Sequence, residues 1–311
     1  MSFLYVFQKM LELFLIVMVG YIACKCGVFD KSARVKVTQL VLNVTLPAMI
    51  LSSVMNQEHM MEAGDILFLL LIAVLSYIIL FAVALIVPRI LRIKPSQAGV
   101  YRFMLAFGNV GFIGYPVTQA IFGDSAVFYT SVFNMPFNIL VYSIGVMFLN
   151  SGTKDREGSI ISYKLLLTPC MITSVLSIIM AMLQFRGPAL IGETCDMVAA
   201  ITTPAALMII GSSLAELPFR EMFSNVKVYL FAICRLLILP LLTYFIFGLF
   251  VKDNSLLLGV AVVIAGMPVA TNGTMLCLEY GADEKLMAQG TFITTLLSVI
   301  TIPLLAMLVA V

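Results

Sequence analysis

Two short runs that combine glycine, proline and asparagine interrupt apolar stretches in distant parts of the chain, over residues 108–116 and 266–272. Proline lacks the N–H that an α-helix needs and glycine weakens a helix, so each run predicts an opened helix. Opened backbone in an apolar environment needs other polar partners. The amides of Asn109 and Asn272 can serve that backbone or hold a small solute. The chemistry that these residues favour is therefore non-covalent binding.

The candidate binding residues are the amides, hydroxyls and prolines at these runs, together with polar residues on other apolar stretches. They are Asn109, Pro116, Asn134, Asn138, Thr45, Thr203, Pro268, Thr271, Asn272 and Arg235. The residues expected to open or bend the helices are Gly108, Gly111, Gly114, Gly266, Pro47 and Pro204. Asn134 and Asn138 are one helical turn apart and share a face. Thr45 and Thr203 stand just before prolines and could instead bond their own helix backbone.

Arg235 lies within a long apolar stretch, where an ionisable side chain is costly and is by default functional. Its planar guanidinium could bind a carboxylate through two parallel hydrogen bonds. It could instead cap the carbonyls of an opened helix, or extend its charged end toward solvent. The sequence leaves both a substrate contact and a structural role open.

Composition defines the environment of these residues. Of the 311 residues, 62% are hydrophobic and 11% are charged, whereas soluble domains have about 45–50% apolar and about 25% charged residues. A soluble fold of this size cannot hide that much apolar surface, so the chain is predicted to be an all-α polytopic membrane protein. The six cysteines and the single histidine, His59, form no metal-ligand pattern. We expect no metal, no cofactor and no enzymatic activity.

Ten stretches are apolar and long enough to cross a membrane, which takes about 20 residues. They cover residues 3–24, 35–55, 66–87, 97–122, 125–149, 163–185, 194–215, 227–251, 256–278 and 284–311. Of the 18 Lys and Arg residues, 14 fall on one set of alternate loops, counting Arg102 at the edge of its span, and three fall on the other set. Because basic loops remain in the cytoplasm, this asymmetry predicts ten spans in the cytoplasmic membrane with both termini external.

The chain also divides into two related halves. The longest hydrophilic connection, residues 150–162, is predicted to be a cytoplasmic linker between residues 1–149 and 163–311. Thr45-Leu46-Pro47-Ala48 has a counterpart in Thr202-Thr203-Pro204-Ala205, and Gly114-Tyr115-Pro116-Val117 has one in Gly266-Met267-Pro268-Val269. Five spans per half is an odd number, so a duplicated half would be inverted relative to the other. Paired, interrupted segments in two such halves indicate a transporter's substrate site.

The same runs resemble motifs of the auxin efflux carrier family, which includes the plant PIN-formed carriers and bacterial malate and malonate permeases. Residues 108–116 resemble the family's fourth-helix motif, and residues 267–272 with 280–283 resemble its ninth-helix motif. Residues 43–47 and 235–240 resemble its second and eighth helices. The chain lacks the long central loop of many plant members, so it is most similar to the bacterial branch.

This resemblance implies a ten-helix inverted-repeat transporter of small carboxylates. Helices 1, 2, 6 and 7 would form a scaffold and a homodimer contact, and helices 3–5 and 8–10 would form a moving transport domain. Helices 4 and 9 would break and cross at Pro116 and Pro268, with the substrate beside the crossing.

We therefore expect a secondary transporter that moves a small organic anion, such as malate or an auxin-like acid, by alternating access. The N-termini of the half-helices would attract the carboxylate. The alternative is a sensor or receptor that keeps the transporter fold without net flux. Apart from Glu12 near one end of the first span, no acid or histidine lies deep in the spans. This leaves uniport, exchange and sodium coupling open.

Overall fold

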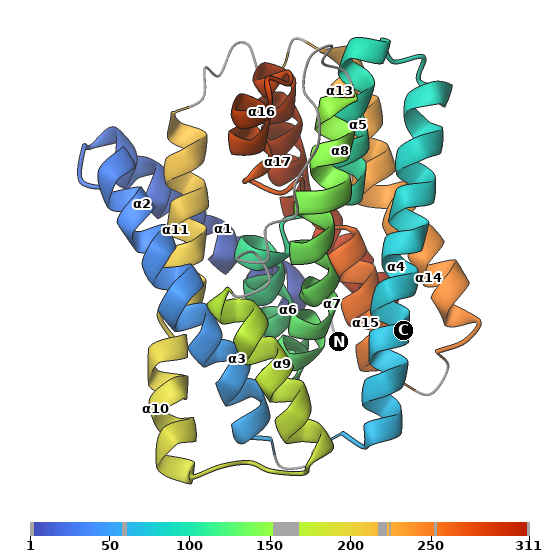
Figure 1. Ribbon diagram of the computed structural model, residues 1–311. Helices are drawn as coiled ribbons and strands as arrows, with labels where there is room; N and C mark the ends of the chain where they lie inside the picture. The colour runs from blue at the N-terminus through green and yellow to red at the C-terminus, as the bar shows by residue number, and fades with distance from the viewer. Residues whose placement is uncertain are drawn as a thin grey trace.

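The computed structural model describes residues 3–57, 61–151, 168–216, 223, 225–251 and 254–309, and the regular elements in them are helices (Figure 1). Seven helical runs there are long and apolar enough to cross a membrane. Three shorter apolar helices, Val110–Phe122, Pro169–Met182 and Ser255–Ala265, fall within the predicted fourth, sixth and ninth spans. The prediction of an all-α polytopic membrane protein is confirmed. His59 and most of the predicted linker 150–162 lie outside the described residues.

The helices follow one another along the chain with short connections. They are α1 (Phe3–Lys25), α2 (Lys31–Leu40), α3 (Leu46–Met55), α4 (Ala63–Ile90), α5 (Pro95–Ala106), α6 (Tyr115–Phe122), α7 (Ser125–Leu140), α8 (Val146–Asn150), α9 (Pro169–Met182), α10 (Ala189–Ala199), α11 (Thr202–Ala215), α13 (Val226–Ile233), α14 (Leu239–Gly248), α15 (Ser255–Ala265), α16 (Gly273–Tyr280) and α17 (Glu284–Val309). The π-helical turns η1 (Val41–Thr45), η2 (Val110–Gly114), η3 (Val141–Gly145) and η5 (Cys234–Ile238) directly precede α3, α6, α8 and α14.

Three of these π-turns accommodate a proline. Pro47, Pro116 and Pro240 each lie at the second position of the α-helix that follows the turn. The residue before each proline donates its N–H to the carbonyl five residues earlier. This wider turn relieves the clash between the proline ring and the preceding turn. Of the residues predicted to open the fourth span, Pro116 therefore leaves its helix continuous, and Pro47 does the same in the second span.

Pro204 lies near a true interruption. The predicted seventh span consists of α10, which ends at Ala199, and α11, which begins at Thr202. Pro204 is in the first turn of α11, where a backbone N–H has no partner within the helix, so the proline costs little.

The helices form two packed groups (Figure 1). The first group contains α1, α2, α3, α9, α10 and α11, on the left of the figure, and the second contains α4–α8 and α13–α17. Within the first group, Gly20 lies against the backbone of Met208, and Gly211 against the backbone of Val17. Glycines at these points let α1 and α11 approach closely, as small residues do between membrane helices. The groups meet where α3 contacts α7 and where α1 contacts α6 and α17.

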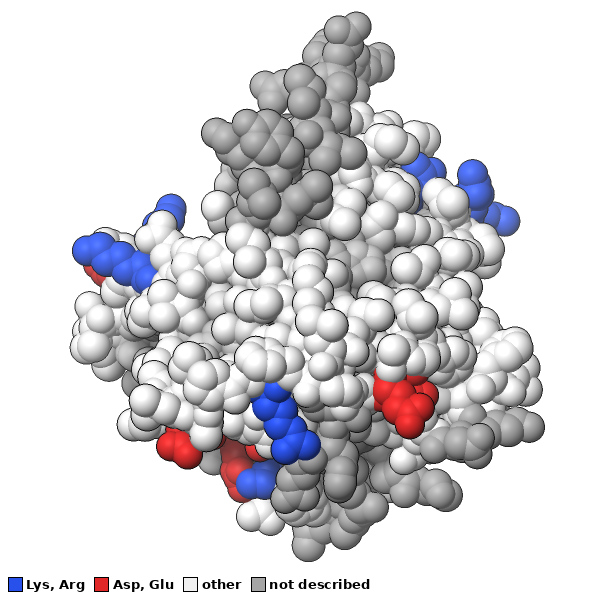
Figure 2. Space-filling view, turned by 60° about the horizontal axis from the view of Figure 1, so that its bottom comes forward, with Lys and Arg blue, Asp and Glu red and all other residues white. Residues whose placement is uncertain are grey.

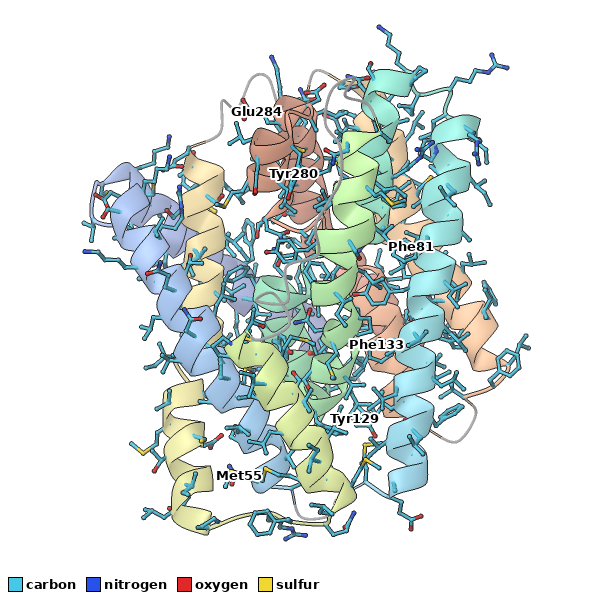
Figure 3. The ribbon with its side chains drawn as sticks, viewed as in Figure 1. Met55, Phe81, Tyr129, Phe133, Tyr280 and Glu284 are labelled. Carbon is cyan, nitrogen blue, oxygen red and sulfur yellow. The ribbon has the colours of Figure 1, made fainter. Side chains whose placement is uncertain are left out.

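Apolar side chains cover the outside as well as the inside. On α4, Leu67, Leu71 and Ile78 are more than half exposed, while Phe81 and Phe133 pack within the second group (Figure 3). Figure 2 shows a face that is mostly uncharged, with basic and acidic side chains in small separate patches. Water disfavours an apolar surface of this extent and a bilayer accommodates it.

Candidate functional site

The predicted fourth and ninth spans are each interrupted, and the two interruptions lie side by side. α5 ends at Ala106 and η2 begins at Val110, so residues 107–109 lie outside a helix. α15 ends at Ala265 and α16 begins at Gly273, so residues 266–272 do the same. Gly108 and Val269 form an antiparallel β-bridge between the two segments. Residues 107–109 and 266–272, together with Arg235, are called the crossing below.

The two segments of the crossing satisfy each other's backbone. The N–H of Asn109 donates to the carbonyl of Pro268 at 2.7 Å, and the N–H of Ala270 donates to the carbonyl of Phe107 at 3.1 Å. The N–H of Val269 donates to the hydroxyl of Thr294 on α17 at 3.1 Å. Such pairing is needed because freed backbone groups inside a membrane have no water to bind. The predicted ninth span thus opens at its proline, Pro268. The predicted fourth span opens at residues 107–109, which lie seven to nine residues before Pro116.

Arg235 caps carbonyls on both sides of the crossing. The side chain is 1% exposed. Its Nε donates to the carbonyl of Met267 at 3.0 Å and its Nη1 donates to that of Leu105 at 2.6 Å. A Cβ atom at Gly108 would collide with the Arg235 guanidinium, so glycine permits this close approach. Of the two roles left open by the sequence, this geometry corresponds to the capping of an opened helix.

A small cavity of about 10 Å³ lies beside the guanidinium. It is lined by Ser76 and Tyr77 of α4 together with Arg235 and Gly108. This volume has room for about one water molecule and none for a carboxylate. A substrate contact to Arg235 would therefore require rearrangement of the crossing.

The asparagine amides at the crossing are only partly used. Asn109 accepts the N–H of Phe112 through Oδ1 at 3.2 Å and so caps η2, but its buried Nδ2 has no partner among the described residues. At the other segment, Asn272 Oδ1 also lacks a partner in the described part of the chain, and Thr271 is half-buried. Leaving a buried polar group unpaired costs about 1–3 kcal/mol. Asn109 Nδ2 can donate a hydrogen bond to a ligand, and Asn272 Oδ1 can accept one from it.

The other predicted glycines differ in their surroundings. A Cβ atom at Gly266 would collide with the side chain of Leu305, and one at Gly114 would press on Val110. A Cβ atom at Gly111 would meet nothing within 4 Å. Gly266 therefore serves close packing, whereas Gly111 lies beside open space.

A second set of predicted residues is buried on η1 and α7. The hydroxyl of Thr45 and Oδ1 of Asn134 have no hydrogen-bond partner within the described ranges. Tyr115, which was not among the predicted binding residues, lies fully buried, and its hydroxyl makes no hydrogen bond of ordinary length but interacts with the side chain of Asn134. A tyrosine directly before a helix-bending proline was the available signal. The side chain of Asn138 lies outside the part of the chain that is described.

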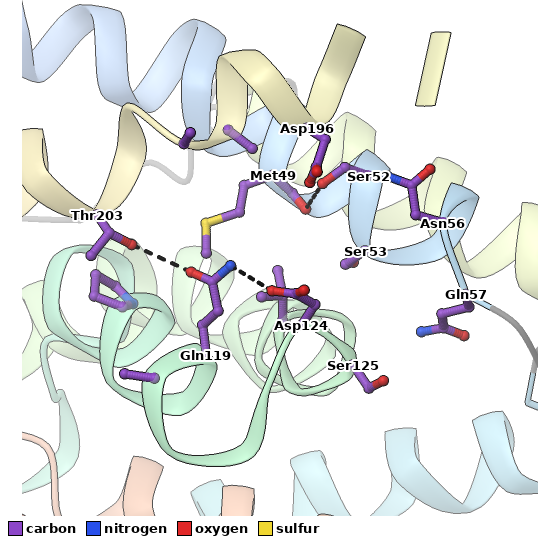
Figure 4. Close-up of a pocket in the computed structure, with 15 residues that line it drawn as sticks. Met49, Ser52, Ser53, Asn56, Gln57, Gln119, Asp124, Ser125, Asp196 and Thr203 are labelled. Atoms are coloured by element: carbon purple, nitrogen blue, oxygen red, sulfur yellow. Dashed lines mark hydrogen bonds between the residues drawn. The ribbon is translucent and has the colours of Figure 1, made fainter. Parts of the chain in front are cut away.

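A cavity of about 830 Å³ separates the first group from α6 and α7 (Figure 4). Of the predicted residues, Pro116 and Thr203 line it. The Thr203 hydroxyl donates to Gln119 Oε1 at 3.4 Å, and Gln119 Nε2 donates to Asp124 Oδ1 at 2.8 Å. Gln119 of α6 thus links α11 of the first group to the start of α7, where Asp124 is the N-cap residue.

The cavity is polar and acidic. Asp124 and Asp196 are among the residues that line it, and its described lining contains no Lys, Arg or His. Ser52 and Ser53 also line it, and each donates to a carbonyl of its own helix, those of Met49 at 3.1 Å and Ile50 at 2.7 Å. The Ser-Ser pair that follows Pro47 was the sequence signal for these two. Gln119, Asp124 and Asp196 carried no comparable signal.

Comparison with known proteins agrees with this architecture. The chain matches the membrane transport protein family over residues 5–159 and 156–306. It is 26% identical over 298 residues to an uncharacterised transporter of Methanocaldococcus jannaschii, covering 93% of this chain and 94% of the relative. A protein of Rhizobium meliloti named "Putative malonate transporter" is 23% identical over 299 residues, with coverages of 94% and 92%.

A third relative is the uncharacterised transporter YfdV of Escherichia coli, which is 23% identical over 301 residues and covered to 95% in both chains. The family match extends over nearly the whole sequence, and the relatives are matched over nearly their whole length. The sequence motifs resemble those of the auxin efflux carriers, most closely the bacterial branch. The family match agrees with this resemblance, and the chain belongs to the membrane transport protein family, which is the family of those carriers.

Proposed function

We propose that the protein is a secondary transporter that moves a small organic anion across the cell membrane by alternating access. The observation that carries this proposal is the crossing, at which two interrupted helices meet within one helix group. A polar cavity lies between α6 of that group and the first group. Irregular backbone at membrane depth is tolerated inside protein or beside a polar cavity, and transporters bind substrate at such paired breaks. The name of the Rhizobium meliloti relative favours a carboxylate as the cargo.

In this proposal, ten spans form two inverted five-helix halves, residues 1–149 and 163–311, with both termini external. The second group moves and the first group is the scaffold, through which two copies form a homodimer. The three shorter apolar helices support the count of ten. The distribution of Lys and Arg supports the orientation.

The proposed substrate contacts are neutral donors and acceptors rather than a full positive charge. Asn109 and the N-terminus of η2 would hold the carboxylate, because helix N-termini favour anions. The other proposed site residues are Thr45, Pro116, Asn134, Asn138, Thr203, Pro268, Thr271 and Asn272. Arg235 would act indirectly, by holding the backbone of the crossing in place. The acidic cavity disfavours a dianion over a monoanion on the way to the site.

Reconstitution into liposomes tests the proposal. Vesicles that contain the purified protein are loaded with unlabelled acetate, malonate or indole-3-acetate. They should take up the labelled form of the same acid from outside by exchange. A thermal-shift measurement with the same three acids tests binding independently, because a ligand that binds the folded state stabilises it. Binding without exchange would favour a sensor. If the protein neither binds nor exchanges the three acids and instead binds an organic cation tightly, the anion assignment is refuted.

A further inference from the structure

The guanidinium of Arg235 is buried without a negatively charged side chain beside it. It forms no ion pair with a carboxylate of the residues that the structure describes. Residues 66–87 of α4 and the helices α7 and α15, which contribute to the cavity next to it, contain no charged residue. Carbonyl groups cap the charge but do not neutralise it, and a buried charge is costly unless it is paired. The surroundings of Arg235 therefore favour a small anion from solution.

One nitrogen of the guanidinium faces the small cavity. Nε and Nη1 donate to the carbonyls of Met267 and Leu105, whereas Nη2 makes no hydrogen bond with the described residues. A Cβ atom at Gly108 would collide with Nη2, so this nitrogen lies directly against Gly108. Arg235 and Gly108 both line the cavity. The N–H groups of Nη2 are thus available to a ligand there.

A second polar group of the cavity is also without a hydrogen bond to the described residues. Tyr77 of α4 lines the cavity, and its hydroxyl lies close enough to the Arg235 guanidinium to interact with its charge. The neighbouring Ser76 also lines the cavity, but its hydroxyl donates to the carbonyl of Ile72 at 2.9 Å. The free donors at the cavity are therefore Nη2 of Arg235 and the hydroxyl of Tyr77.

The size of the cavity selects the ligand. Its volume of about 10 Å³ is close to the roughly 10–15 Å³ that one water molecule needs. A chloride ion is a single atom only slightly larger than water, whereas a carboxylate has three heavy atoms. The rest of the lining is apolar and includes Leu80 and Phe133. Such a site suits a large, weakly hydrated ion that needs few hydrogen bonds.

We propose that the cavity binds one chloride ion, which accepts hydrogen bonds from Nη2 of Arg235 and the hydroxyl of Tyr77. Hydrogen bonds between charged groups are the strong ones, and the ion pairs a cation that carbonyls alone hold. Chloride would stabilise the crossing through Arg235. It is a resident ion rather than the cargo, so its binding does not depend on the proposed function.

Equilibrium dialysis with radiolabelled chloride tests the proposal on the purified protein in detergent, with gluconate as the other anion. One chloride should bind per chain, and chloride should raise the unfolding temperature at constant ionic strength. Iodide and gluconate, which are too large for the cavity, should not displace it. A folded wild-type protein that binds no chloride, or that iodide stabilises equally, would overturn the proposal, and the cavity would then hold water only.

Two variants locate the ion. Tyr77→Phe should bind chloride at least about 10-fold more weakly, as expected for one lost hydrogen bond to a charged group. The matched control is Tyr101→Phe, because Tyr101 is buried in the same apolar cluster but does not line the cavity. It should bind chloride like wild type. Wild-type affinity in Tyr77→Phe, or equal loss in both variants, would overturn the proposal.

Arg235→Lys decides the question if Tyr77→Phe fails to fold. A lysine keeps the charge, but its single nitrogen is needed by a carbonyl of the crossing, and no second nitrogen faces the cavity. The folded Lys variant should therefore lose chloride binding. Chloride binding equal to that of wild type in this variant would place the ion elsewhere and refute the site.

Discussion

The crossing and the buried contact between the two groups around Tyr115 both contain polar side chains, but they differ in how their polar groups are satisfied. At the crossing, the backbone of each interrupted helix bonds to the other, and Arg235 caps carbonyls from both sides. At the contact between the groups, the oxygens of Thr45, Tyr115 and Asn134 make no hydrogen bond of ordinary length with the described residues, although the side chains of Tyr115 and Asn134 interact with each other. The backbone of the crossing is bonded within the protein, whereas the amides of Asn109 and Asn272 and the side-chain oxygens of the second region remain open.

This difference separates a joint of the fold from a place prepared for a ligand. Hydrogen bonds made within the protein contribute to the free energy of unfolding, and removing one partner leaves the other buried and unpaired. Buried atoms that are already open lower the stability of the free protein and can gain a bond only from a solute. Substitutions of Arg235 and Gly108, which hold the backbone of the crossing, should therefore affect folding first, and substitutions of the open side chains should affect binding first.

The largest effect is expected at Arg235. Arg235→Ala removes two charge-assisted hydrogen bonds and leaves the carbonyls of Leu105 and Met267 buried without them. The loss should be about 3–6 kcal/mol, since each such bond contributes about 1.5–3 kcal/mol. The measurement is the yield of folded protein in detergent by size-exclusion chromatography, together with its thermal stability. Normal yield would contradict the view that the crossing is a structural joint.

Arg235→Lys separates capping from substrate binding. Lysine keeps the charge and can donate to one of the two carbonyls, but it lacks the planar fork. If Arg235 only caps, the Lys variant should recover much of the yield and bind carboxylates with unchanged affinity. A well-folded Lys variant that no longer binds would instead place Arg235 in direct contact with the substrate.

The next effect compares two glycines of the same motif. A Cβ atom at Gly108 would collide with the guanidinium of Arg235, so Gly108→Ala should lower stability by about 1–3 kcal/mol, as overpacking does. Gly111→Ala is the matched control, because a Cβ atom there meets nothing within 4 Å. Its unfolding temperature should equal that of wild type or exceed it slightly. Equal stability of the two variants would contradict the tight geometry at Arg235.

The sequence predicted the class of fold and the segments that carry the crossing, because composition and the Gly, Pro and Asn runs are local signals. It assigned the opening of the fourth span to the run 108–116 without locating it within that run. Proline rules suggested Pro116, but a π-turn accommodates that ring, and the chain opens where Gly108 can pair with Val269. That pairing depends on a segment more than 150 residues away, which no local rule contains.

The sequence also identified several polar side chains without indicating which would find partners. Arg235 was a candidate because it is charged, but its bonds to Leu105 and Met267 come from tertiary packing. Tyr115 was read only as part of a repeated motif, and as an aromatic residue in an apolar span it gives no sign of an open hydroxyl. Burial and hydrogen bonding of a given atom depend on neighbouring helices, so this part of the site required the structure.

A smaller effect is expected from Pro116→Ala. The proline lies in the first turn of α6 after a π-turn, outside the hydrogen bonds of the crossing. The yield of folded protein should therefore match that of wild type, and the exchange rate in liposomes should fall less than 3-fold, on the order of 0.6 kcal/mol. Abolished exchange with normal yield would mean that the π-turn itself, and with it the orientation of Tyr115, is essential for transport.

The smallest effect concerns charge in the cavity, where water weakens electrostatic interactions. Asp196 is exposed on the cavity wall, unlike the enclosed Arg235. Asp196→Asn removes one negative charge that repels an approaching anion, so the apparent affinity for malonate should rise about 2-fold at low salt. The gain should be smaller for acetate, which has one charge, and should vanish at about 0.5 M salt, where the screening length is only a few ångströms. Asp196→Glu keeps the charge and should behave like wild type. A gain that persists at high salt would mean that Asp196 touches the bound anion, and the cavity would then belong to the binding site rather than to its entrance.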